Sequence, residues 1–119
     1  MAELERAYAV RSYSSGTRGR AINNARNHHW IADDPGGDEV GAGELFLSGI
    51  SACAVNMIER IANEEEIPLD WMDVSVEAYR NPDAELGERT VFEDINIHLQ
   101  MWGVSDDDGD TLVNTWKRR

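Results

Sequence analysis

The chain has 119 residues, and its 11 Lys and Arg stand against 23 Asp and Glu, which gives a formal net charge of -12. This length predicts a single domain over residues 1–119, and a hydrophobic content of 41% is typical of a folded protein. The negative charge repels phosphate backbones and anionic lipids, which argues against nucleic-acid and membrane-surface partners. With no leader pattern at Met1 and no apolar run of roughly 20 residues, we expect a cytoplasmic protein without a membrane partner.

The first third of the chain is predicted to form short antiparallel strands. Loose alternation of side chains indicates a strand over residues 5–14, which ends at the turn residues 14–17. Residues 20–27 and 28–33 supply two further short strands. The Asp, Pro and Gly residues over 33–37 then end regular structure.

A long helix is predicted over residues 43–63. Its apolar positions recur every three or four residues, at Phe46, Ile50, Cys53, Met57 and Ile61. Further apolar residues widen this stripe almost around the helix, which predicts a buried central helix. Pro68 is expected to stop it.

The second half of the chain predicts a strand pair followed by a helix. Apolar and polar residues alternate over 72–79 and again over 95–101, on either side of a loop that contains Gly87. Ser105 is the expected N-cap of a last helix, whose acidic first turn suits the helix dipole. The order of strands, helix, strands and helix predicts an α+β fold.

Cys53 is the only thiol in the sequence, and two interpretations of it stay open at this point. Helical periodicity favours a small core side chain, because free cysteine is among the most buried residue types. A reactive thiol needs a cationic neighbour that stabilises the thiolate. Arg18, Arg20 and Arg26 are candidates, since they lie beside turn residues in an otherwise acidic chain, although the sequence does not place them next to Cys53.

Other residues predict no metal site and no cofactor. His28 and His29 are adjacent in a predicted strand and therefore point to opposite faces, which disfavours a shared ion with His98. The acidic run 106–110 lacks the ligand spacing of a calcium loop and is better explained by helix capping. Glu44 lies at the start of the central helix, where a carboxylate is favoured whatever the function.

Several segments resemble the OsmC-like family, which includes the organic hydroperoxide resistance proteins. Residues 19–21 and 25–35 are similar to the family's first strands and Asp-Pro turn, and 43–53 is similar to its central-helix signature, with a Glu-Leu start and an Ala-Cys end. Residues 69–103 and 105–119 resemble its strand pair and second helix. The resemblance covers nearly the whole chain, and its specific part is the central helix.

This resemblance implies an intertwined homodimer with an active-site thiol near the subunit interface. Cys53 matches the residue that attacks a peroxide oxygen and becomes a sulfenic acid. Arg18 is the best match to the family arginine that stabilises the thiolate, with Arg20 second, and Glu44 matches the glutamate that orients it. The classical peroxidases place that glutamate one residue earlier, where this chain has Gly43.

The resolving cysteine of the peroxidase branch comes after the second helix in a Cys-Pro pair, and this sequence stops at Arg119. The leading hypothesis is therefore a peroxidase that uses Cys53 on organic or hydrogen peroxide and is regenerated by an external thiol. The alternative is a noncatalytic, stress-associated dimer that binds a small hydrophobic ligand. In that case Cys53 only packs.

Overall fold

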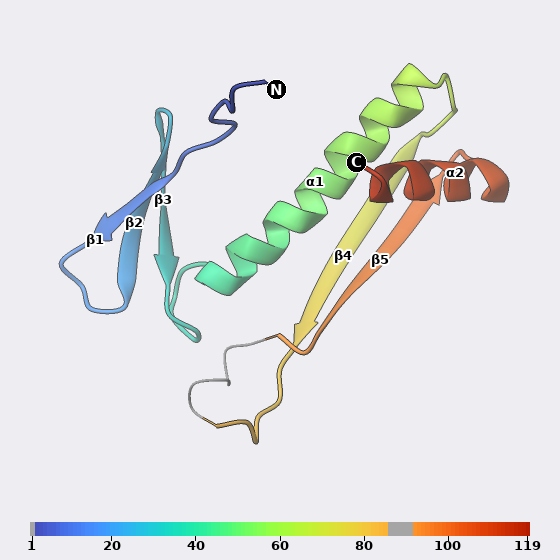
Figure 1. Cartoon of the computed structure of the whole chain (residues 1–119). Coiled ribbons are helices and arrows are strands. Elements are labelled where there is room, and N and C mark those ends of the chain that lie inside the picture. The colour runs from blue at the N-terminus through green and yellow to red at the C-terminus, as the bar shows by residue number, and fades with distance from the viewer. Residues whose placement is uncertain (1, 86–91) are drawn as a thin grey trace. The chain divides into compact units, whose positions relative to one another are not determined.

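A computed structural model describes residues 2–85 and 92–119 of the chain. They fold as two compact units, Met1–Phe46 and Leu47–Arg119 (Figure 1). The first unit carries a three-stranded sheet, and the second carries a two-stranded sheet and a C-terminal helix, while the long helix begins in the first unit and continues into the second. The predicted α+β class and the order of the elements are confirmed.

The first sheet is antiparallel in the order β1-β2-β3, with β1 at Arg11–Ser14, β2 at Arg20–Ala25 and β3 at His28–Asp33. The strand expected over residues 5–14 is therefore shorter than predicted. The register explains this, because Arg11 pairs with Asn24 near the end of β2, so the residues before Arg11 have almost no strand left to pair with.

Helix α1 spans Ala42–Glu64, close to the predicted bounds. It ends before Pro68 in a backbone motif in which Glu66, at a φ of 55°, bonds to the carbonyl of Asn63, and Ile67 bonds to that of Ala62. The expected burial holds only for the C-terminal half, where the buried residues are Ala54, Ile58, Ile61 and Ala62. The N-terminal half is exposed in this single chain, where Phe46 is 58% exposed.

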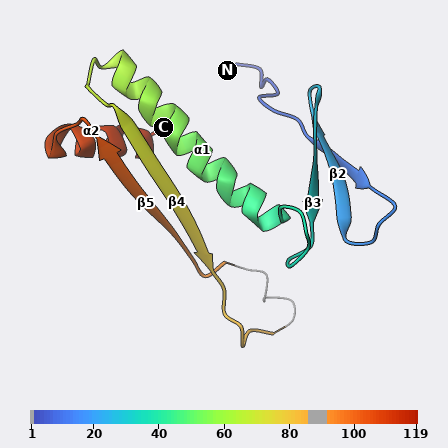
Figure 2. The ribbon, with the colours of Figure 1, turned by 180° about the vertical axis from the view of Figure 1, so that it is seen from behind.

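Strands β4, at Trp71–Tyr79, and β5, at Asp94–Trp102, pair in antiparallel register (Figure 2). They confirm the strand pair predicted for the second half of the chain. Their side chains alternate between the core and a wet face, where the Trp71 and Trp102 rings lie 4.9 Å apart. The predicted loop residue Gly87 lies outside the described residues. Helix α2 comes next at Asp106–Lys117, and the Ser105 side chain accepts the Asp108 N–H, as expected of its N-cap.

The hydrophobic core of the second unit lies between α1, α2 and the inner face of β4 and β5. Ile58, Ile61 and Leu112 are completely buried, and they pack with Ala62 and Met72. Beside this core, Arg119 forms an ion pair with Glu64 at the end of α1, with its guanidinium 3.3 Å from the carboxylate. This unit is thus stabilised chiefly by apolar burial.

Among the described residues, α1 is the one helix that is long and apolar enough to cross a membrane, with a mean hydropathy of 1.4 in its most apolar window. The expectation that no stretch would meet this test is wrong for α1. The core helix of a soluble protein passes it as well, so length and composition alone do not place this helix in a bilayer.

Candidate functional site

Cys53 lies on α1 as a free and exposed thiol. Its sulfur donates a hydrogen bond to the Met57 thioether, 3.6 Å away and one helical turn further along. The packing interpretation predicts a buried side chain, whereas this one is accessible from solvent in the single chain. Cys53 belongs to the unit Leu47–Arg119.

In the other unit, Arg20 and Asp33 form a two-pronged ion pair. The Arg20 Nε donates to Asp33 Oδ1 at 2.7 Å, and its terminal nitrogen donates to Oδ2 at 2.8 Å. This planar, charge-assisted geometry is the strongest form of such a pair. Hydrogen bonding from Arg20 lowers the pKa of Asp33 to about 2, and the same bond raises the pKa of Arg20 further above its usual range.

Asp33 also organises the loop that leads into α1. Its side chain is buried, and Oδ2 accepts the Glu39 N–H at 3.0 Å. Its own backbone N–H donates to the Val40 carbonyl at 2.9 Å. A Cβ on Gly37 would come within 2.6 Å of the Asp33 side chain, so only glycine fits where the loop passes this carboxylate.

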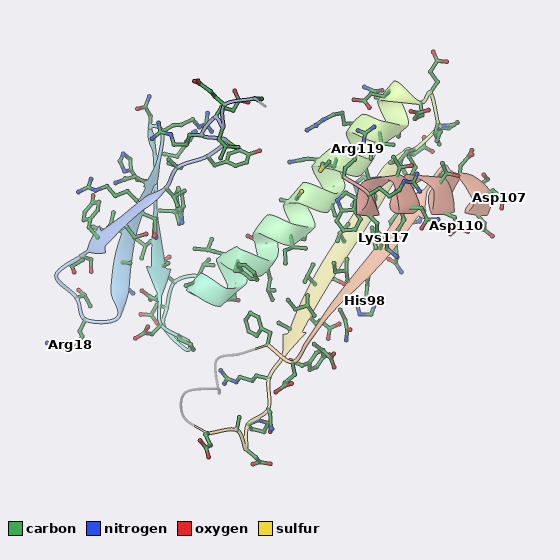
Figure 3. The ribbon with its side chains drawn as sticks, in the orientation of Figure 1. Arg18, His98, Asp107, Asp110, Lys117 and Arg119 are labelled. Atoms are coloured by element: carbon green, nitrogen blue, oxygen red, sulfur yellow. The ribbon has the colours of Figure 1, made fainter. Side chains whose placement is uncertain are left out.

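Arg18 lies in the turn between β1 and β2, and Figure 3 shows its side chain pointing away from the ribbon. The turn is held by Ser15, whose hydroxyl donates to the Arg20 carbonyl at 2.8 Å and accepts the Thr17 N–H at 3.1 Å. Gly19, at a φ of 83°, accepts the Asp34 N–H at 2.9 Å. Arg18 is exposed between these anchored neighbours.

The other two candidates have local structural roles. Arg26 has a φ of 54° in the tight turn between β2 and β3, where its side chain is exposed. Glu44 lies in the first turn of α1, and its Oε1 accepts the Gly41 N–H at 2.9 Å. This is one of the two hydrogen bonds of a capping box, in which the side chain at the third helical position accepts the N–H of the N-cap residue. The bond explains a carboxylate at that position without reference to an arginine.

The residues described by the structure contain no group of three or more His, Cys, Asp or Glu side chains arranged to hold a metal ion. On the wet face of β4 and β5, Glu77 accepts a hydrogen bond from the Tyr79 hydroxyl at 2.5 Å, and it lies 3.2 Å from His98 Nε2. The bond to Glu77 raises the pKa of Tyr79.

Two hollows adjoin the Arg20–Asp33 pair. One, of about 490 Å³, is lined by residues of all three strands, among them Tyr13 and Asn23. The other, of about 330 Å³, lies between the Arg18 turn and the loop over residues 33–38. Both contain carboxylate and guanidinium groups, and the smaller one suits polar or charged small molecules better than hydrocarbon.

The structure thus places Arg18 in the β1–β2 turn and Arg20 at the start of β2. It adds Asp33, which the sequence analysis treated only as the point where a strand ends and regular structure breaks. A usable signal was present. Two strands separated only by Arg26 and Asn27 must pair with Arg20 opposite Asp33, and this is the observed register.

A family model described as OsmC-like protein matches residues 35–119 of the chain. No curated protein matches the sequence at a significant level.

Three solved structures illustrate the similarity in fold. An OsmC-like protein from Mycoplasma pneumoniae superposes with a TM-score of 0.84 at 16% identity, over 98% of this chain and 84% of that one. An organic hydroperoxide resistance protein from Elizabethkingia anophelis, with thiocyanate bound, gives 0.74 at 16% identity, over 98% and 85%. An organic hydroperoxide resistance protein OsmC from Legionella pneumophila gives 0.69 at 18% identity, over 96% and 84%.

Proposed function

The chain belongs to the OsmC-like protein family, whose model matches residues 35–119, and we propose on this premise that it is a thiol-dependent peroxidase acting on organic or hydrogen peroxides. Two of the similar solved structures are named organic hydroperoxide resistance proteins, which supports this substrate class. We further propose that residues 1–119 work as one domain in the cytoplasm, where external thiols are abundant.

The observation that carries the proposal is the exposure of the Cys53 thiol. A core cysteine is inert because no peroxide reaches it, whereas a sulfur at the surface of α1 can be attacked and can also meet a reductant. The resemblance supports the same assignment, because Cys53 matches the attacking cysteine at the Ala-Cys end of the family's helix signature.

In the proposed reaction, the Cys53 thiolate attacks the distal oxygen of the peroxide and breaks the O–O bond. The alkoxide leaves, takes up a proton and departs as the alcohol, while the sulfur is oxidised to a sulfenic acid. An external thiol condenses with this sulfenic acid, which releases water and forms a mixed disulfide. A second thiol equivalent then reduces that disulfide and restores Cys53.

Arg18 is our candidate for the guanidinium that stabilises the thiolate and attracts the peroxide. Its side chain is exposed, whereas Arg20 is committed to Asp33. Arg26 serves the β2–β3 turn and is the least suited of the three. Glu44 is proposed to orient the arginine through the acceptor sites of its carboxylate that are not used by the Gly41 N–H.

A homodimer is part of this proposal, because the single chain leaves large apolar side chains uncovered. Phe46 on α1 is 58% exposed, and Ile95 and Ile97 on β5 are 41% and 36% exposed. Burial of such side chains against a second copy would remove the cost of hydrating them. Sedimentation at micromolar concentration should give a dimer, and a monomer would contradict this part of the proposal.

The second candidate function is binding of a small hydrophobic ligand without catalysis. The uncovered apolar residues favour it, since the surface that would suit a second subunit also suits a nonpolar molecule. Under this alternative, Cys53→Ala would leave ligand binding nearly unchanged, and no peroxide would be consumed.

The test is peroxide consumption in the presence of a small dithiol. The wild-type protein should turn over cumene hydroperoxide, and Cys53→Ser should reduce the rate to the background of the dithiol alone, with an unchanged circular dichroism spectrum. Asn56→Ser, an exposed change on the same helix, is the matched control and should retain activity. Equal rates for wild type and Cys53→Ser would reject the peroxidase proposal.

A further inference from the structure

The turn that carries Arg18 is tied to the loop before α1 by one buried carboxylate. We propose that Asp33 is a positioning residue, which holds the Arg18 turn in place through its grip on Arg20. This inference rests on the proposed function for the role of Arg18, but the grip itself is a property of the first unit.

The first step is that Arg20 is not free to serve the thiol. Two of its nitrogens are engaged with both oxygens of Asp33, at 2.7 and 2.8 Å, and the acceptor is only 6% exposed. Moving this guanidinium elsewhere would leave a buried carboxylate without its cation, which is strongly unfavourable. Arg20 is therefore a fastening point of the turn.

The second step is that Arg20 and Asp34 are hydrogen-bonded to residues on both sides of Arg18. The Arg20 N–H donates to the Thr17 carbonyl at 3.2 Å, and the Arg20 carbonyl accepts from Ser15. The residue next to Asp33 also takes part, because the Asp34 N–H donates to the Gly19 carbonyl at 2.9 Å. Fixing the Arg20 side chain thus fixes the short stretch of chain that bears Arg18.

The third step is that Asp33 is itself rigid. Beyond Arg20, its carboxylate accepts the Glu39 N–H, its backbone bonds to Val40, and a backbone bridge joins it to Gly41 just before α1. Gly37 lies against its side chain with no room for a Cβ. Because several contacts restrain this carboxylate, it can hold the turn in a defined position. Supporting contacts orient reacting groups in the same way.

The experiment compares Asp33→Asn, which keeps the size of the side chain but removes its charge, with Asp38→Asn, which removes an exposed carboxylate of the same loop. Amide hydrogen exchange of Arg20 and Asp34 is measured by NMR. Loss of a charge-assisted bond should speed their exchange by about tenfold or more in Asp33→Asn. Asp38→Asn should leave both rates unchanged.

An unpaired Arg20 could unfold the first unit, so the double variant Asp33→Asn/Arg20→Gln, which removes both charges, repeats the measurement. It should show the same faster exchange in a folded protein. Unchanged exchange in either folded variant would overturn the grip of Asp33 on the turn, whatever the protein does with peroxides.

The link to Arg18 is tested by a double-mutant cycle on peroxide consumption. Misplacing a reacting group by a fraction of an ångström should lower kcat/KM by about tenfold in Asp33→Asn. In an Arg18→Ala background the same change should cost nothing more, because the group being positioned is gone. An equal loss in both backgrounds would show a merely structural role and overturn the inference. If the wild-type protein is inactive on peroxide, the proposed function is rejected. The exchange rates would still test whether Asp33 holds the turn through Arg20.

Discussion

The two units of this chain are stabilised by different forces. In the first, the buried side chains include Asn23 and Asp33, and Asp33 forms a salt bridge with Arg20 on the neighbouring strand. In the second, Ile58, Ile61 and Leu112 are fully buried and surrounded by other apolar groups. Directional, charge-dependent bonds therefore shape the first unit, and area-dependent apolar burial shapes the second.

This difference bears on function. Hydrogen bonds and ion pairs fix the direction of a group, as they do for the Arg20 guanidinium in the first unit. Apolar packing fixes an element but leaves its uncovered face open, and the second unit presents Cys53 on such a helix. We therefore expect loss of apolar burial to destabilise mainly the second unit, and loss of charge to destabilise mainly the first.

The largest effect is expected in the second unit. Leu112→Ala should lower the free energy of unfolding by about 3 kcal/mol, because it leaves a cavity in a fully buried site. Leu4→Ala makes the same chemical change at a fully exposed position and should cost less than about 0.5 kcal/mol. Urea denaturation measures both, and equal losses would contradict the assigned core.

The first unit should instead respond to acid. Because the pKa of Asp33 falls from 3.8 in the unfolded chain to about 2 in the folded one, its stabilising contribution is complete above about pH 4. That contribution is lost as the pH falls toward 2. Carbon NMR of the Asp33 carboxyl should give a titration midpoint near 2, and a midpoint at 3.8 or above would contradict the ion pair.

A smaller effect is expected at the start of α2, where a polar contact supports the apolar unit. Ser105→Ala removes the acceptor for the Asp108 N–H and should lower the free energy of unfolding by about 1 kcal/mol. Ser105→Asp keeps an acceptor at the N-cap and should retain most of the stability. If the two variants lose stability equally in thermal unfolding, the cap does not contribute as described.

Much of the fold could be predicted from the sequence, because periodicity reports which side of an element is buried. The alternation over β4 and β5 and the N-cap at Ser105 are local patterns, and both are confirmed. The strand expected before Arg11 was wrong because strand length depends on a partner, and β2 ends too early to supply one.

The site was less predictable, since its contacts join residues distant in sequence. The arginines were recognised as candidates, but only the strand register places Arg20 opposite Asp33 and so commits it. The apolar stripe of α1 does not reveal how much of it one chain covers by itself, and Phe46 is exposed in this one. The roles of Cys53, Arg18 and Glu44 stay predictions.

The central claim is that Cys53 is a peroxide-reactive thiol, and mass spectrometry after dimedone trapping tests it most directly. With less than one equivalent of cumene hydroperoxide per chain, the peptide that contains Cys53 should carry the sulfenic-acid adduct, while the methionines stay unmodified. A thiol that remains free of adduct while peroxide persists in solution would contradict the account.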